Sequence, residues 1–144
     1  MSDFLLDTNV LSEFRKGDRC DPGVRDWMQG APNEMLFVSV VGLGEIRQGI
    51  ERIRRRDREQ ARVLEKWLKD LKAGFADRIL PVNEPVADQW GRLGSQQPGP
   101  ALATILAATA LVFGLVVVTR DEDGFRNTGV AMVNPFSKPK TTKP

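Results

Sequence analysis

Short apolar runs alternate along the chain with longer stretches in which apolar residues recur at helical spacing. A short apolar run bounded by polar or turn residues is typical of a buried strand, and apolar residues three or four positions apart are typical of an amphipathic helix. Pro81 places one of the expected strands near an edge of the sheet. The pattern predicts strands over residues 4–6, 36–40, 79–82, 115–119 and 130–133.

The predicted helices fill the intervals between these strands. Asp21 and Asn83 each precede a helical stretch and are suitable N-caps, and Gly114 ends the most apolar helix. Residues 94–100 and 121–129 are expected to be polar loops. The expected helices cover residues 10–14, 22–29, 84–93 and 101–112, together with a pair of amphipathic helices between residues 45 and 72 that breaks near 55–57.

This alternation of strands and helices predicts an α/β fold, a three-layer α/β/α sandwich with a mostly parallel central sheet. A chain of 144 residues fits a single domain, which we expect to cover residues 1–136. Residues 137–144 are rich in lysine, proline and threonine and are expected to form a disordered tail.

The composition narrows the chemistry that this domain can perform. The chain has no histidine, which excludes Ser-His-Asp and Cys-His triads, HExxH metal sites and histidine general bases. Cys20 is the only cysteine, so an intrachain disulfide and a zinc site of several thiolates are excluded, and a reducing cytoplasm is the expected compartment. No window approaches the ~20 apolar residues of a membrane span, so no membrane partner is expected. The formal charge of +2 permits an anionic partner without requiring one.

Three acidic residues follow three of the predicted strands. Asp7 ends the first strand, Asp121 comes just after the fourth, and Glu45 lies about a turn and a half into the helix after the second. Each acid alone has an ordinary structural explanation: a helix cap, a surface ion pair or a turn. Because ligands bind beyond the carboxyl ends of parallel strands, their common position favours a shared site.

Converging carboxylates are costly without a cation. Two unit charges about 4 Å apart repel by roughly 4 kcal/mol at an effective dielectric near 20. Such a cluster takes up protons or binds a hard divalent ion, and oxygen ligands without histidine or thiolate favour Mg²⁺ or Mn²⁺ over zinc. A metal-bound water can attack a phosphodiester, so the residues themselves point to a metal-dependent phosphodiester hydrolase.

A basic stretch and the tryptophans admit more than one interpretation. Between residues 52 and 72 arginine and lysine outnumber the acids. This favours a solvated helix surface with ion pairs one turn apart over a surface that binds phosphates or an acidic partner.

Trp27, Trp67 and Trp90 lie on apolar stripes and are expected in the core rather than as base-stacking platforms.

The opening Phe4-Leu5-Leu6-Asp7-Thr8-Asn9-Val10-Leu11-Ser12-Glu13 resembles that of the PIN-domain ribonucleases of the VapC toxin family, in particular the FitB-like branch. The resemblance continues in the stretches 39–50, 105–110, 118–121 and 133–136, in the order of the family. It implies a parallel α/β/α sandwich, homodimers, Mg²⁺- or Mn²⁺-dependent cleavage of RNA, and inhibition by a cognate antitoxin.

By position in this resemblance, Asp7 corresponds to the family's first acid, Glu45 to the second and Asp121 to the fourth, with Asp123 as a neighbouring metal residue. The third acid is missing, because Ala103 stands at its position. We therefore expect a catalytically impaired ribonuclease. The alanine is either an engineered substitution or a mark of a naturally weakened member, and the three retained acids favour the first explanation.

Two other functions stay open. The chain could be a non-catalytic PIN-fold module that acts through its antitoxin in a promoter-binding repressor complex, where contacts with DNA come from the partner. It could also cleave DNA by the same metal chemistry, although the PIN-fold relatives that do so are larger and carry more acids.

Overall fold

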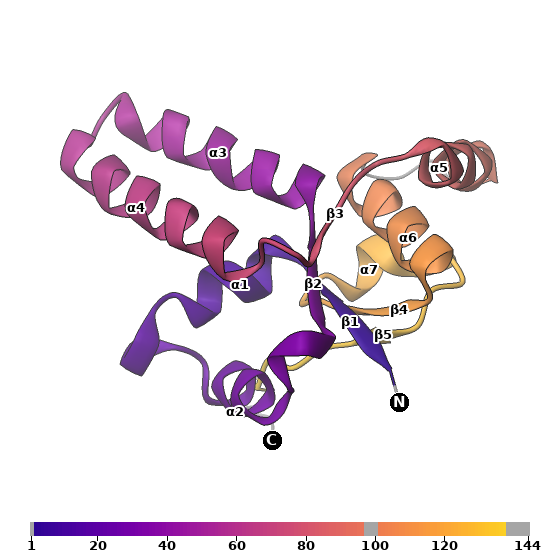
Figure 1. The fold of residues 1–144 in the computed structure, drawn as a ribbon, viewed down its shortest axis with the longest axis horizontal. Helices are drawn as coiled ribbons and strands as arrows, with labels where there is room; N and C mark the ends of the chain where they lie inside the picture. Colours follow the sequence, from indigo (N-terminus) through magenta and orange to yellow (C-terminus); the bar gives the residue numbers. More distant parts are fainter. Residues whose placement is uncertain (1, 97–100, 138–144) are drawn as a thin grey trace, which may run out of the picture.

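The computed structural model describes residues 2–96 and 101–137 and contains a five-stranded sheet (Figure 1). The strands run in the order β3-β2-β1-β4-β5, and every pair is parallel. β3 lies at one edge, as the proline beside it predicted. The strands are β1 (Asp3–Leu6), β2 (Leu36–Ser39), β3 (Ile79–Leu80), β4 (Leu115–Val118) and β5 (Met132–Val133). The predicted α/β sandwich is confirmed.

The helices begin and end close to where the sequence predicts. The side chain of Asp21 accepts a hydrogen bond from the amide of Val24 (3.0 Å), and Asn83 accepts one from the amide of Val86 (3.1 Å). Gly114 has a φ of +71°, a conformation that glycine adopts freely, and it ends the apolar helix. The helices are α1 (Thr8–Phe14), α2 (Pro22–Gly30), α3 (Val40–Arg54), α4 (Arg58–Gly74), α5 (Glu84–Gln96), α6 (Ala101–Phe113) and α7 (Glu122–Phe125).

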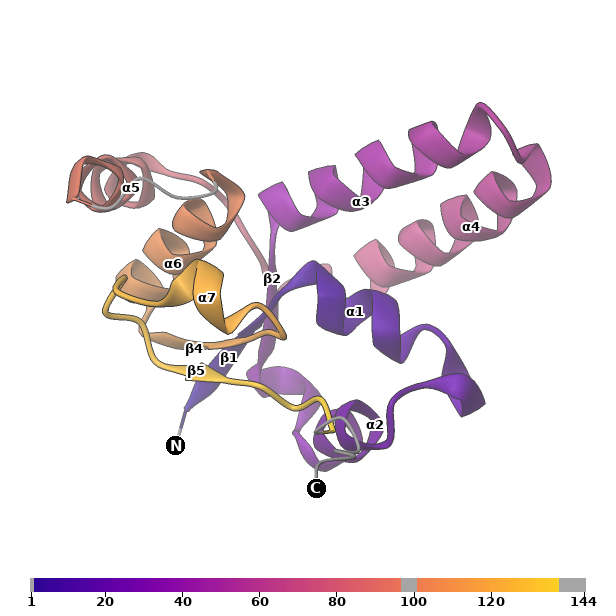
Figure 2. The same cartoon turned by 180° about the vertical axis from the view of Figure 1, so that it is seen from behind.

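Alternate residues of the strands face two separate hydrophobic cores. Leu6 and Val118 pack with α1, α2, α3 and α4 on one side of the sheet, whereas Leu5 and Val117 pack with α5, α6 and α7 on the other. Figures 1 and 2 show these two helical layers, with α3 and α4 forming an antiparallel hairpin that extends away from the sheet. The period-2 alternation along buried strands therefore gives the three layers.

Two segments that were expected to be loops contain helix. α5 continues to Gln96, beyond the predicted end at residue 93, because Leu93 is buried in its last turn and keeps that turn packed. α7 lies inside the segment predicted as a polar loop, since Phe125 is buried in the second core. Residues 97–100 of the first predicted loop lie outside the described residues.

The three tryptophans differ in environment. Trp27 packs edge-on against Phe4, with the ring centroids 4.9 Å apart, and Trp67 packs against the first core, as predicted. Trp90 is 42% exposed, so the prediction of a core position for it was wrong. It lies at the margin of the buried face of α5, which Val86 and Leu93 supply, and 42% of it stays in contact with solvent.

The last described residue, Ser137, is attached to the start of α2. Ser137, the first residue of the predicted tail, donates from its amide to the side chain of Asp21 (3.0 Å), and residues 138–144 lie outside the described part of the chain. Within residues 2–96 and 101–137, no helix has the length and apolar character needed to cross a bilayer.

Candidate active site

A cavity of about 350 Å³ lies at the carboxyl edge of the central strands and collects the predicted acids. Asp7 follows β1 directly, and Asp121 comes three residues after the end of β4. Glu45 is carried to the same place by α3, which begins immediately after β2. The cavity is lined by Asp7, Thr8, Asn9, Ser12, Glu45, Leu102, Ala103, Leu106 and Asp121. Side chains that are far apart in the sequence therefore share one hollow.

Asp7 is the most buried of these acids, with 7% of its surface exposed. One carboxylate oxygen caps α1 by accepting from the amide of Thr8 (2.7 Å), and the other accepts from the hydroxyl of Thr119 (2.8 Å). Burial raises the pKa of Asp7, these hydrogen bonds oppose the rise, and the nearby charges of Glu45 and Asp121 add to it. The ionised carboxylate is thus held in a place that favours a compensating positive charge.

Glu45 is tied to the start of α1 by a short hydrogen bond. The hydroxyl of Thr8 donates to Oε1 of Glu45 at 2.5 Å, although the two residues are 37 positions apart. Thr8 therefore contacts both acids: its amide binds Asp7, and its hydroxyl binds Glu45. This residue fixes the relative position of α1 and α3 at the cavity.

Asp121 is positioned by the loop that follows β4. Its side chain accepts from the amide of Gly124 (3.0 Å) and so caps α7, while its own amide donates to the hydroxyl of Thr119 (2.9 Å). Thr119 is fully buried and links Asp121 to Asp7. Asn9 adds a second link, because its side-chain oxygen accepts from the amide of Arg120 (3.2 Å).

Sequence reasoning singled out the acids but not Thr8, Asn9 and Thr119. A signal for them was present, because Thr8 and Asn9 directly follow the first acid and Thr119 directly follows the strand before Asp121. Polar residues at the carboxyl ends of parallel strands line the ligand-binding edge of the sheet. The whole polar turn after each strand, rather than its acid alone, forms the site.

The two remaining candidate positions, Ala103 and Asp123, differ in their location relative to the cavity. Ala103 lies in the cavity wall and is 6% exposed, so a longer side chain at this position reaches the same hollow as the three acids. Asp123 is not among the residues that line the cavity. Its carboxylate forms an ion pair with Arg126 (2.5 Å) on the surface, where the side chain of Asp123 is 84% exposed. Of the four acids, Asp123 alone lies away from the cavity.

The donor set fits a hard divalent cation in its chemistry, since it consists of carboxylate, hydroxyl and amide oxygens. In the described residues, however, no group of three or more histidine, cysteine, aspartate or glutamate side chains is arranged to hold a metal ion. Ala103 contributes no oxygen to the cavity, and the carboxylates of Glu45 and Asp121 accept hydrogen bonds from Thr8 and Gly124.

Known proteins are similar to this chain over most of its length. The chain is 31% identical over 137 residues to Toxin FitB of Neisseria gonorrhoeae, covering 92% of this chain and 97% of that protein. It is also 31% identical over 140 residues to VapC ribonuclease Y4jK of Sinorhizobium fredii, covering 92% and 96%.

Solved structures agree with these relatives. The crystal structure of FitAcB from Neisseria gonorrhoeae superposes with a TM-score of 0.83 at 32% identity, covering 92% of this chain and 97% of the other. The structure of FitAB bound to the IR36 DNA fragment superposes with a TM-score of 0.82 at 29% identity, covering 94% and 97%. The family model of the PIN domain matches residues 4–131. The resemblance seen in the sequence is confirmed: the chain belongs to the PIN domain family.

Proposed function

We propose that this protein is a metal-dependent endoribonuclease, the toxin component of a toxin–antitoxin pair, present here in a catalytically impaired form. The observation that carries the proposal is the shared cavity of Asp7, Glu45 and Asp121, with Ala103 in its wall. Membership of the PIN domain family and similarity to a protein named as a VapC ribonuclease support RNA as the substrate.

Asp7, Glu45 and Asp121 would hold Mg²⁺ or Mn²⁺. The bound ion would supply a polarised water and neutralise the charge that develops on the phosphodiester. Thr119 and Thr8 keep the carboxylates of Asp7 and Glu45 in place through their hydroxyl groups. Because Asp7 is buried and its pKa is raised, its affinity for a cation depends on these donors to keep it ionised.

The similarity to known proteins also suggests which partners this protein binds. Similarity to chains in toxin–antitoxin structures supports a cognate antitoxin as a protein partner. One of these structures contains DNA, and we propose that DNA is contacted only indirectly, through the antitoxin. We further propose a homodimer that acts in the cytoplasm, with residues 1–136 forming the PIN domain.

The proposal is tested by restoring the missing acid. The purified protein with Ala103, the reference that is called the wild type in each comparison, and the Ala103→Asp variant are incubated with total RNA, with and without Mn²⁺. We expect weak or no cleavage by the wild type and metal-dependent cleavage by the variant. Adding Asp7→Asn to Ala103→Asp serves as the matched control, since it keeps the shape of residue 7 and removes its charge. Equal RNA patterns from all three proteins, each confirmed as folded, would refute the nuclease assignment.

Ala103 itself favours a second function, that of a non-catalytic module in a promoter-binding repressor complex with the antitoxin. A protein that acts only in this way has no use for a complete carboxylate set. Expression of Ala103→Asp alone separates the two: growth arrest that also requires Asp7 and Glu45 supports the enzyme, and normal growth supports the module. A parallel digest of single-stranded RNA and DNA tests the remaining alternative of DNA cleavage.

A further inference from the structure

The turn between α3 and α4 carries the strongest concentration of charge in the chain. Residues 52–58 contain five arginines and one aspartate and have a formal charge of +4, whereas the whole chain has only +2. The rest of the protein is therefore net acidic. This turn lies at the outer end of the helical hairpin, away from the sheet (Figure 1).

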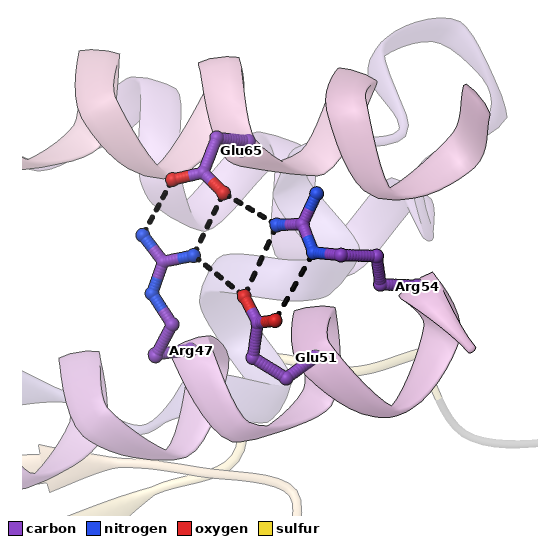
Figure 3. Close-up of polar contacts among 4 residues, drawn as sticks. All are labelled: Arg47, Glu51, Arg54 and Glu65. Carbon is purple, nitrogen blue, oxygen red and sulfur yellow. Dashed lines mark hydrogen bonds and ion pairs between the residues drawn. The ribbon is translucent and has the colours of Figure 1, made fainter. Parts of the chain in front are cut away.

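Part of the positive charge on the hairpin is neutralised within it. Arg47 and Arg54 of α3 bind both Glu51 of the same helix and Glu65 of α4, forming a four-residue network (Figure 3). The hydrogen bond from Arg47 lowers the pKa of Glu65 to about 2, with Arg54 adding to the shift. These two arginines join α3 to α4 and have little capacity left for an external anion.

The other arginines of the turn are not engaged in this way. Within residues 2–96 and 101–137, none of them forms an ion pair, and all are exposed. Asp57, the only acid of the stretch, is occupied as the N-cap of α4, where it accepts from the amide of Gln60 (3.0 Å). We call these exposed residues the hairpin-tip arginines: Arg52, Arg55, Arg56 and Arg58.

The hairpin tip is connected with the candidate active site along α3. A second hollow, of about 250 Å³, begins at Thr8 and Glu45 and follows α3 as far as Ile53, next to the tip. At a rise of 1.5 Å per residue, the end of α3 lies about 14 Å from Glu45 along the helix. About four stacked nucleotides span this length at ~3.4 Å each. A single strand that is cleaved at the cavity can therefore reach the tip.

We infer that the hairpin-tip arginines bind the phosphate backbone of the RNA substrate on one side of the scissile bond. The inference rests on the proposed nuclease function and adds a binding surface to it. Arginine suits this role because its planar guanidinium donates two parallel hydrogen bonds to a phosphate and stays charged at every physiological pH. Contacts of this kind carry affinity without sequence preference.

The test measures binding apart from cleavage. A fluorescently labelled single-stranded RNA of about 12 nucleotides is titrated with the protein in EDTA, which prevents metal-dependent cleavage, and anisotropy is followed at several salt concentrations. We expect Arg55→Gln/Arg56→Gln to weaken binding about tenfold and to reduce the slope of log affinity against log salt by about 1.4, the value for two lost phosphate contacts on a single strand.

Lys69→Gln/Lys72→Gln is the matched control, because it also removes two exposed cations that have no ion pair in the described part of the chain, from the other end of α4. We expect this control to bind RNA within about twofold of the wild type. An equal loss in both double variants would show a general charge effect and overturn the inference, as would unchanged binding in the tip variant.

Two further titrations test whether the hairpin-tip arginines prefer single-stranded RNA to other anionic partners. In them, duplex DNA or a polyglutamate peptide replaces the RNA. A tip variant that loses peptide or duplex binding but keeps RNA binding overturns the inference. In the Ala103→Asp background, we expect the tip variant to reduce kcat/KM for the long RNA and not for a dinucleotide. If that background cleaves nothing, the nuclease proposal fails, while the EDTA titration still decides the inference on binding.

Discussion

Replacing Ala103 with aspartate adds a fourth carboxylate to a cavity that already holds Asp7, Glu45 and Asp121. The position is 6% exposed, so the new charge is largely removed from water. Without a cation we expect the variant to be less stable than the wild type by about 2–4 kcal/mol, because a like charge about 4 Å away costs roughly 4 kcal/mol at an effective dielectric near 20.

A divalent cation should reverse this loss. A ligand that binds only the folded state at 100 times its dissociation constant stabilises it by about 2.7 kcal/mol. For a domain of this length, 1 kcal/mol corresponds to about 3–4 °C in Tm, so Mn²⁺ should raise the Tm of Ala103→Asp by about 10 °C. We expect a much smaller rise for the wild type, which has one carboxylate fewer in the cavity.

Thermal unfolding followed by circular dichroism, with Mn²⁺, Mg²⁺ or EDTA, measures these shifts. Ala103→Asn is the matched control, since asparagine has the shape of aspartate without its charge. A similar rise in Tm with Mn²⁺ for the asparagine and aspartate variants would refute the reasoning, because it would place the bound ion away from residue 103.

Three further predictions concern Asp121 of the site, the second hydrophobic core and the ion pairs of the helical hairpin. In the Ala103→Asp background, Gly124→Ala should weaken Mn²⁺ binding at least tenfold by calorimetry, because the added methyl group meets the carboxylate of Asp121 and displaces it; unchanged affinity would exclude Asp121 as a ligand. Phe125→Ala should destabilise the protein by about 3–5 kcal/mol in a urea titration, since the side chain is 1% exposed, and a loss below 1 kcal/mol would contradict its place in the second core. Glu65→Gln should lower the Tm at pH 7 by a few degrees at most, because the ion pairs that it breaks are exposed. The folded-state pKa of Glu65, about 2, lies below its usual 4.5, so its stabilisation is present above pH 4.5 and is lost toward pH 2; the difference from wild type should therefore shrink over that range, and a difference that grows on acidification would contradict the ion pairs.

Most of the fold could be predicted from local pattern. Buried strands such as β4 are continuous apolar runs, and the caps Asp21 and Asn83 mark helix starts because their side chains satisfy amides that the helix leaves free. The misjudged segments depended on tertiary packing. No local pattern shows that Phe125, inside the segment predicted as a loop, is buried or that Trp90 is 42% exposed, since both outcomes depend on how the element packs against the second core.

The candidate site was predictable at the level of its acids and not at the level of its hydrogen bonds. Strand ends converge in a parallel sheet, so the cavity of Asp7, Glu45 and Asp121 follows from topology. The bond from Thr8 to Glu45 and the bridge by Thr119 depend on how α3 and the β4 loop are oriented. Those orientations come from packing between distant segments, which a single sequence does not display.

The basic stretch contains ion pairs that the sequence predicted, and the same hairpin contains others that it could not. Ion pairs one turn apart were predicted for residues 52–72 and occur, for example between Glu59 and Arg62 or between Lys66 and Asp70. The pairing of both Arg47 and Arg54 with Glu65 on the neighbouring helix could not be foreseen, because it depends on the register of α3 against α4. The bonds to Glu51 within α3 and to Glu65 on α4 together distinguish Arg47 and Arg54 from the arginines at the tip.

The central claim, that oxygens from distant parts of the chain hold one divalent ion, is tested most directly by locating the ion. Crystals of the Ala103→Asp variant soaked in Mn²⁺ give an anomalous difference map at the manganese absorption edge. We predict a peak in the cavity, within about 2.0–2.3 Å of carboxylate oxygens of Asp7 and of the new side chain at position 103. A map at saturating Mn²⁺ with no peak in the cavity, or with peaks only at surface acids such as Asp123, would contradict the claim.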